Sequence, residues 1–440
     1  MLKLRSLWDR LRSSLWFVPS LLVTGAVALA LGLVEIDASG EWTHLQVRWP
    51  RLFGAGAAGS RGMLSAIASS MITVAGVAFS ITIVALALAS SQYTSRILRN
   101  FMRDRANQAV LGTFLGIFVY CVVVLRTIRG GDEGAFVPSL AVMFGVVLSL
   151  VGIGCLIFFI HHIALSIQAE SIIKSATDET IEAIERLFPD DLGEAAGLDA
   201  GPAPELAASV WQPIPARKTG YIQAVDGDGL LRFACEREAV VRMERGVGEF
   251  VVEGAPLVAI VGGGPPDDGL ADAVAALYTV GRQRTTVQDA GFGVRQIVDI
   301  ALKALSPGIN DTTTAVTCVQ YLSAVLARLA ARRLADPCRT DGGKVRVIVR
   351  GVNFPGLLGE AFDQIRRNAE GNVAVLLALL EALEVVAGRT RDAGRLGAIA
   401  RQVELIAEVA RRTIPLLPDR EGIEAALDRH TNRGVTWTKN

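Results

Sequence analysis

The sequence predicts an α-helical membrane protein with four transmembrane helices, followed by a mixed α+β, mainly helical cytoplasmic domain that contains a small β-sandwich-like unit. Two observations support this prediction. Four stretches of about twenty or more residues without Asp, Glu, Lys or Arg lie in roughly the first 160 positions. Each is long enough to cross a hydrocarbon core of about 30 Å as a helix. The remaining residues alternate between short strand-like runs and amphipathic helical patterns.

Four domains are expected from these patterns. Residues 1–164 form the transmembrane domain, and residues 165–215 form a helical extension of the fourth span with a linker. Residues 216–263 form the β-rich unit, and residues 264–440 form the mainly α-helical cytoplasmic domain. The formal charge is zero, with 44 basic and 44 acidic side chains, which argues against nucleic-acid binding.

The uncharged stretches are Leu15–Val34, Met63–Ser91, Ala106–Leu125 and Val137–Ile160. The segments before the first stretch and between the second and third are basic, whereas the other two connections are balanced. The basic residues before the first stretch are Lys3, Arg5, Arg10 and Arg12. Those between the second and third stretches are Arg96, Arg99, Arg103 and Arg105. Because basic loops remain in the cytoplasm, we expect a multi-pass protein of the bacterial inner membrane with both termini cytoplasmic.

The spans carry no acidic or basic residue near their middle, which argues against a pump that relays charge through the membrane. His161 and His162 stand where the fourth span ends. They would either sense pH or bind a metal, or else serve as ordinary interfacial residues. Five cysteines are scattered without CxxC spacing, so the sequence predicts no zinc site, no disulfide framework and no cofactor.

The second stretch differs from the others because its small and hydroxyl residues recur at spacings of three and four. The positions at this spacing, which therefore share one helical face, are Ser69, Thr73, Gly76, Ser80, Val84, Ala87 and Ser91. The candidate pore or packing residues among them are Ser69, Thr73, Gly76, Ser80 and Ser91. Such a face lets two helices approach closely. In a ring of subunits the same face would line a narrow polar pore, because hydroxyl groups replace part of an ion's hydration shell. Both interpretations stay open on the sequence.

The fourth stretch continues at helical spacing as far as Leu187, which predicts one long helix from the membrane into the cytoplasmic domain. A Gly/Ala/Pro-rich linker follows at Gly193–Pro204. The runs TGYIQAVD, AVVRME and EFVVEGAPLVAIVG predict strands, with a short helix at LLRFACEREA. Their order resembles the half-motifs of lipoyl-like β-sandwich domains. No lysine lies between Thr219 and Gly262, so a lipoyl carrier role is not indicated.

The densest group of polar residues lies in residues 281–315. Thr286 and Asp289 predict a capped helix start, and Asp311 is placed to cap the next helix after the turn Ser306-Pro307-Gly308. The candidate ligand or gating residues are Arg282, Arg284, Asp289, Arg295, Ser306, Asn310 and Asp311.

Two interpretations of this segment remain. In the functional one, exposed N–H groups at a helix N-terminus attract a small anionic ligand, and the arginines supply further positive charge. In the structural one, Asp311 only caps its helix and the arginines pair with Asp289 and Asp299.

The run SPGINDTTTA, preceded by QDAGFGVRQIVDIALKAL, resembles the hallmark segment of an uncharacterised family of predicted bacterial membrane proteins, a domain of unknown function. The resemblance extends to VAFSITIVALALASSQYTSRILRNF, FIHHIALSIQ and TGYIQAVD, and so to nearly the whole chain. The family usually has proline where this chain has Thr312. The resemblance implies the four-span topology and assigns no chemistry.

Three functions are compatible with these observations. The leading hypothesis is an oligomeric, channel-like or gated membrane protein whose cytoplasmic domain senses a ligand. The second is an envelope scaffold that recruits cytoplasmic partners through its helical face. The third is a membrane enzyme acting on lipid or phosphate compounds near Asp289, Asn310 and Asp311. No Walker loop, nucleophile elbow, HExxH or Rossmann fingerprint occurs, so we expect no catalytic residues of those kinds.

Overall fold

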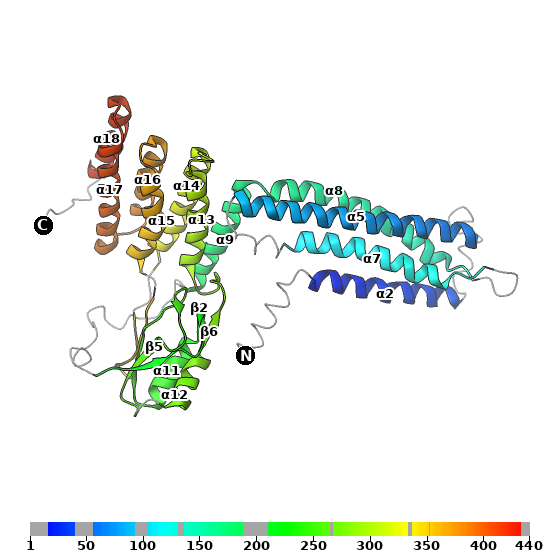
Figure 1. Cartoon of the computed structure of the whole chain (residues 1–440), viewed down its shortest axis with the longest axis horizontal. Helices are drawn as coiled ribbons and strands as arrows, with labels where there is room; N and C mark the ends of the chain where they lie inside the picture. The colour runs from blue at the N-terminus through cyan, green and yellow to red at the C-terminus, as the bar shows by residue number, and fades with distance from the viewer. Residues whose placement is uncertain are drawn as a thin grey trace. The chain divides into compact units, whose positions relative to one another are not determined.

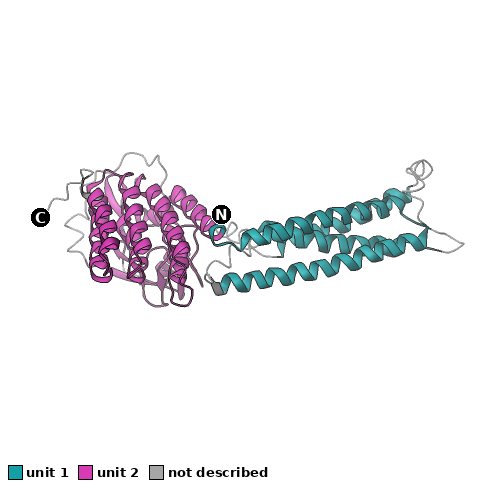
Figure 2. Cartoon of the chain, turned by 90° about the horizontal axis from the view of Figure 1, so that it is seen from above, with its two compact units in different colours: residues 1–171 teal, residues 172–440 magenta. Residues whose placement is uncertain are grey.

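The computed structural model describes residues 16–39, 56–92, 104–130, 136–187, 210–264, 267–332, 337–351 and 353–432. The chain divides into two compact units, residues 1–171 and 172–440, called unit 1 and unit 2 below (Figure 2). The basic residues Arg96, Arg99 and Arg103 and the linker Gly193–Pro204 lie outside the described residues.

Unit 1 consists of four helices that are long and apolar enough to cross a membrane, which confirms the four predicted spans (Figure 1). They are α2 (Phe17–Ala38), α5 (Ala57–Gln92), α7 (Arg105–Thr127) and α8 (Ser139–Ser166). Helix α7 is the most buried and packs against the other three. Two of its glycines, Gly112 and Gly116, let α2 approach closely, because a Cβ at Gly112 would lie 2.8 Å from Leu22 Cδ1 and from Pro19 Cα.

Polar contacts join the helices of unit 1 at both ends. At one end, Asp37 of α2 accepts hydrogen bonds from the backbone N–H groups of Leu140 and Ala141 at 3.2 and 3.0 Å, and so caps α8. At the other end, Asp104 caps α7 and also contacts His162 Nε2 of α8 at 2.5 Å. His162 therefore joins α8 to the start of α7. This contact agrees better with an ordinary interfacial residue than with the other predicted roles.

The prediction of one continuous helix after the fourth span is wrong. Helix α8 ends at Ser166, and α9 (Ala169–Leu187) begins after two non-helical residues, Ile167 and Gln168. The apolar spacing continues across this break, so hydropathy alone does not reveal it. The buried side of α9 packs within unit 2, where Thr180 and Ile184 have no exposed surface.

Unit 2 contains two β-sheets that share one core. One sheet has the order β1-β5-β3-β8-β7 and the other β4-β2-β6. The strands are β1 (Gln212–Pro215), β2 (Gly220–Val225), β3 (Val240–Met243), β4 (Phe250–Val251), β5 (Pro256–Val261), β6 (Tyr278–Gly281), β7 (Cys338–Asp341) and β8 (Lys344–Ile348). Side chains of both sheets meet those of α11 (Gly227–Glu236) and α12 (Asp268–Ala276) in this core.

The β-rich unit therefore extends beyond the predicted range 216–263. Strand β8 pairs in parallel with β3, with Val241 opposite Val347, although about 100 residues separate them. Strand β6 likewise pairs with β2 from outside that range. The sequence did not indicate either pairing, because the pairing of strands that lie far apart in the chain does not change the local pattern of apolar and polar residues.

The rest of unit 2 is a layer of antiparallel helices (Figure 1). They are α13 (Ala290–Ala304), α14 (Thr312–Ala330), α15 (Phe354–Asn368), α16 (Val373–Ala387), α17 (Ala393–Thr413) and α18 (Leu417–Asn432). Asp311 caps α14 as predicted, because its side chain accepts a hydrogen bond from the backbone N–H group three residues on. The same bond is made at the start of α15, α16 and α17 by Asn353, Asn372 and Asp392. The mostly helical fold with strands in the C-terminal unit confirms the predicted fold class.

Candidate functional site

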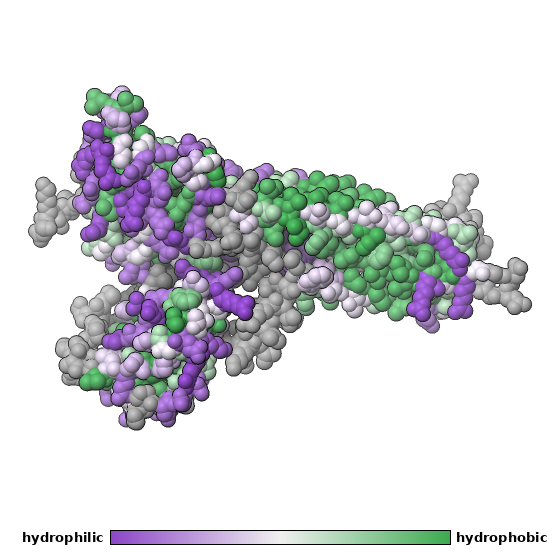
Figure 3. Space-filling view, viewed as in Figure 1, coloured by the Kyte–Doolittle hydropathy of each residue, from purple (hydrophilic) through white to green (hydrophobic). Residues whose placement is uncertain are grey.

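The small and hydroxyl residues of α5 lie on its exposed face. Ser69, Thr73, Gly76 and Ser80 are all exposed, and a Cβ at Gly76 would meet nothing within 4 Å. Ser91 ends the predicted stripe, and its side chain is outside the described residues. Figure 3 shows a pale line of weakly polar residues along α5 on an otherwise apolar surface.

The face of α5 that packs within unit 1 is a different one. Its buried residues are Leu64, Ala68, Met71, Ala75, Ala78, Ala85 and Ala89. At about 100° per residue these lie roughly opposite the hydroxyl stripe. Packing among the described helices of unit 1 therefore does not use the stripe. Thr73 Oγ1 instead donates to the backbone oxygen of Ser69 at 2.8 Å, one turn earlier, which satisfies that hydroxyl without a partner helix.

The second candidate site begins at the N-terminus of α13. Asp289 is only 2% exposed, caps α13 through Phe292 N–H, and pairs with Arg284 through both carboxylate oxygens at 2.8 and 3.0 Å. A Cβ at Gly248, whose φ is +85°, would lie 2.3 Å from Asp289 Oδ2, so the turn before β4 closes directly over this pair. The predicted helix start at Thr286 is wrong, because Asp289 itself is the cap.

Arg295 lies further along α13 and pairs with Asp299 at 3.1 Å. Both ion pairs of the structural interpretation are thus present. Arg282 is exposed and has no ion pair among the described residues. Arg284 and Arg295 thus each pair with a carboxylate close to them in the sequence.

The turn between α13 and α14 carries the remaining candidate residues. Ser306 Oγ donates to the Lys303 backbone oxygen at 2.7 Å, and Asn310 adopts a left-handed φ of 49°. Asp311 accepts from Thr314 N–H at 3.0 Å and from Thr314 Oγ1 at 2.5 Å, and these bonds lower the pKa of Asp311. Its carboxylate occupies the position that an anion would take at the start of α14.

The structure does not bring the two groups of candidate residues together. Asp289 stands at the start of α13 and Asn310 just beyond its end, so the helix separates them by about 22 Å at 1.5 Å per residue. A single site that uses Asp289, Asn310 and Asp311 at once has no geometric support. Among the described residues, no cluster of three or more His, Cys, Asp or Glu side chains suits a metal ion.

The sequence matches a known protein family over most of its length. A family model described as "Predicted membrane protein (DUF2254)" matches residues 12–385. The chain belongs to the DUF2254 family. Uncharacterized proteins of Mycobacterium tuberculosis and Mycobacterium bovis are 33% identical to this DUF2254 member over 434 residues, which cover 97% of this chain and 82% of each relative. No solved structure matches it.

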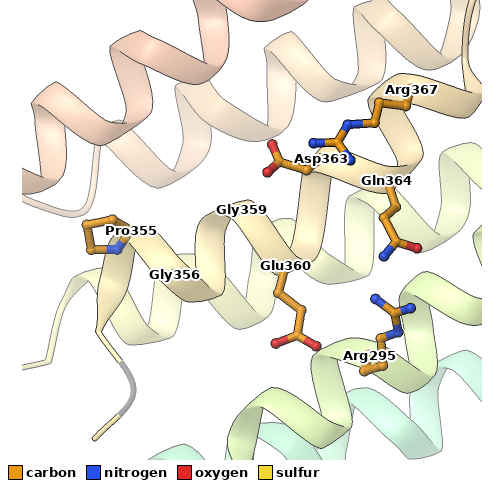
Figure 4. A pocket seen from close by; sticks show the side chains of 8 residues that line it. All are labelled: Arg295, Pro355, Gly356, Gly359, Glu360, Asp363, Gln364 and Arg367. Carbon is orange, nitrogen blue, oxygen red and sulfur yellow. The ribbon is translucent and has the colours of Figure 1, made fainter. Parts of the chain in front are cut away.

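This DUF2254 member also has a shallow polar depression that the sequence did not indicate. It has a volume of about 420 Å³ and runs along one face of α15 (Figure 4). Its lining residues are Arg295, Pro355, Gly356, Gly359, Glu360, Asp363, Gln364 and Arg367. Asp363 accepts a hydrogen bond from Gln402 Nε2 at 2.8 Å, and the side chain of Gln364 lies toward Arg295 (Figure 4). With its amide group turned over, the oxygen of Gln364 accepts from Arg295 Nη1 at 2.7 Å.

Sequence reasoning missed three titratable residues of this depression, namely Glu360, Asp363 and Arg367. Burial raises the pKa of Glu360, while Arg284 and Arg295 nearby act in the opposite direction. Glu360 follows Gly356 by four positions in the helix, so spacing alone places both on one face of α15. That spacing was visible in the sequence, but the neighbouring arginines come from α13, and only the fold brings them close.

Proposed function

We propose that this protein is a homo-oligomeric, channel-like membrane protein in which the hydroxyl stripes of α5 from several copies face a common axis. The main support for the proposal is that Ser69, Thr73, Gly76 and Ser80 are exposed, on the side of α5 that the described part of the chain leaves uncovered. An interface between helices in lipid is enriched in such residues, and a pore needs polar groups along its wall.

Unit 2 is the proposed ligand-sensing and gating part, and we place it in the cytoplasm on the basis of the basic loops. Helix α9 provides the connection, because it follows α8 after two residues. Its Glu185 pairs with Arg328 of α14 at 2.5 Å, and Thr180 packs against Gly293 of α13. A shift of α13 or α14 would therefore act on the end of the fourth span. A small anionic ligand remains the predicted stimulus.

Planar-bilayer recording with the purified full chain tests the proposal. Ser80→Leu places an apolar side chain on the stripe, whereas Ile81→Leu changes a neighbouring exposed position about 100° around the helix. We expect conductance from the wild type and the Ile81 variant, and strongly reduced conductance from the Ser80 variant. Electrically silent bilayers under varied salt and voltage, or a monomeric particle in native mass spectrometry, would contradict the proposal.

The depression on α15 favours a second function, that of an envelope scaffold that recruits a partner to unit 2. Its glycines leave the helix backbone accessible, and Arg367 at its edge is exposed. Co-purification of a stoichiometric partner that Arg367→Glu abolishes, and that Arg401→Glu on α17 preserves, would support this role. Equal recovery with both variants would contradict it.

A further inference from the structure

One edge of the five-stranded sheet in unit 2 is open. The strand order β1-β5-β3-β8-β7 places β7 at one end, so one side of its backbone has no neighbouring strand among the described residues. Three of its four residues, Arg339, Thr340 and Asp341, are exposed. An open edge of this kind offers unpaired backbone N–H and C=O groups to another strand.

The opposite edge of the same sheet is protected. Strand β1 contains Pro213 and Pro215, which have no backbone N–H group to donate. Strand β7 contains no proline. It is bounded by Pro337 directly before it and by the Gly342-Gly343 turn directly after it, so the open stretch is short. Another strand can therefore join this sheet at β7 far more readily than at β1.

The pairing of β7 with β8 shows which of its residues face outward. The backbone oxygen of Pro337 accepts from Val349 N–H at 2.6 Å, so it points toward β8. Asp341 pairs with Lys344 of β8 across the two-residue turn. Successive residues of an antiparallel strand direct their backbone groups to alternate sides. The backbone N–H and C=O groups of Thr340 therefore point away from β8, toward the open edge.

The side chains of β7 are self-complementary in one antiparallel register. When Thr340 lies opposite Thr340 of a second copy, Arg339 of each copy lies opposite Asp341 of the other. Opposite charges and paired threonines are both favourable between neighbouring strands. A shift by two residues, the smallest that still pairs outward-facing groups, would place two arginines or two aspartates opposite each other. Like charges in that position are destabilising, so the residues of β7 select the register centred on Thr340.

The other charged groups of this hairpin act less specifically. Lys344 and Arg346 of β8 are both positive and leave the hairpin with a net positive charge. Asp341 also accepts a hydrogen bond from the Cys235 thiol of α11, so its carboxylate lies on that side of the sheet. Two hairpins therefore repel each other weakly at a distance, where salt screens the charges, and attract only when Arg339 and Asp341 are in contact. One specific pairing is favoured over general association.

We propose that β7 pairs antiparallel with β7 of a second copy of this chain, about a two-fold axis at Thr340, so that the two sheets become continuous. The two-fold axis closes the interface, because each β7 edge is used once and the proline-containing β1 edges lie at the far ends.

This contact needs the two copies to be held near each other. Two short strands bury far less than the about 1,600 Å² of a standard interface. The homo-oligomer of the proposed function would supply the proximity, because copies held in one bilayer meet at a high effective concentration. The inference thus rests on that oligomer, but not on α5 lining a pore.

Cysteine cross-linking of the full chain in vesicles tests the pairing. Thr340→Cys is introduced into a background whose five native cysteines are replaced and whose unfolding temperature is unchanged. Opposite residues of a hydrogen-bonded antiparallel pair have Cα atoms about 5.5 Å apart, within the range of about 4.4–6.8 Å that a disulfide spans. The matched control is Gln212→Cys, an exposed position on the β1 edge of the same sheet.

We expect Thr340→Cys to form dimers under mild oxidation several-fold faster than Gln212→Cys. Arg339→Asp should slow this reaction several-fold, because it places two carboxylates opposite each other. Adding Asp341→Arg to that variant should restore the rate, because the exchanged charges are again complementary. Equal rates at positions 340 and 212, or no recovery in the double charge exchange, would overturn the proposal.

The outcome is separable from that of the proposed function. An oligomer in native mass spectrometry that does not cross-link at position 340 would overturn the β7 pairing and leave the α5 proposal intact. Cross-linking at position 340 in a protein whose bilayers are electrically silent would support the pairing and count against the pore. A monomeric particle would contradict both.

Discussion

The contact between α9 and α13 gives the most quantitative prediction. A Cβ added at Gly293 would lie 2.0 Å from Thr180 Oγ1, 2.9 Å from its Cβ and 3.0 Å from its Cγ2. Thr180 is fully buried, and its hydroxyl is bonded to the Ala176 backbone oxygen at 2.5 Å, so it cannot turn away without losing that bond. We therefore expect Gly293→Ala to force the two helices apart.

The magnitude follows from two opposing terms. Overpacking of this kind costs about 1–3 kcal/mol, and the upper end applies where backbone and a bonded side chain must both move. Replacing glycine by alanine within a helix stabilises the folded state by about 1 kcal/mol. The net loss is about 2 kcal/mol, or roughly 4–8 °C in unfolding temperature for a domain of this size.

Thermal unfolding of the purified full chain, followed by intrinsic fluorescence, measures this loss. Gly397→Ala in α17 is the matched control, because nothing lies within 4 Å of its added Cβ, and it should raise stability by about 1 kcal/mol. In a Thr180→Ala background the loss at Gly293 should shrink. An unchanged unfolding temperature for Gly293→Ala, or an equal loss in both backgrounds, would refute the proposed contact.

Three further predictions concern single carboxylates. Asp311→Ala should lower the free energy of unfolding by about 1 kcal/mol while Asp311→Asn keeps the cap; the stability from Asp311 should disappear as pH falls through its lowered pKa. Because the pKa of Glu360 is raised, the folded state holds its proton more tightly; Glu360→Gln should raise stability at pH 7, with the gain vanishing in acid titrations below the normal glutamate pKa. Asp37→Ala should cost about 1 kcal/mol by uncapping α8, measured in detergent or nanodiscs against exposed Ser39→Ala.

Several helices and strands of unit 2 could not be predicted from the spacing of apolar residues in the sequence. Helix α18 has charged residues around most of its circumference and no clear apolar stripe, so nothing in its sequence predicts it. Strands β1, β6 and β7 have four residues each, too few to distinguish alternation from chance. The cap at Asp311 could be predicted from the sequence, because its side chain binds a backbone N–H group only three residues away.

The sequence by itself determined the four spans, the family, and the helical hairpin of α13 and α14. Each depends on chemistry within a short segment: uncharged length for a span, and capping or turn residues for a hairpin. The tertiary structure decided which face of α5 stays exposed among the described residues and that Thr180 meets Gly293. These depend on contacts between segments far apart along the chain, and packing in three dimensions is what selects them.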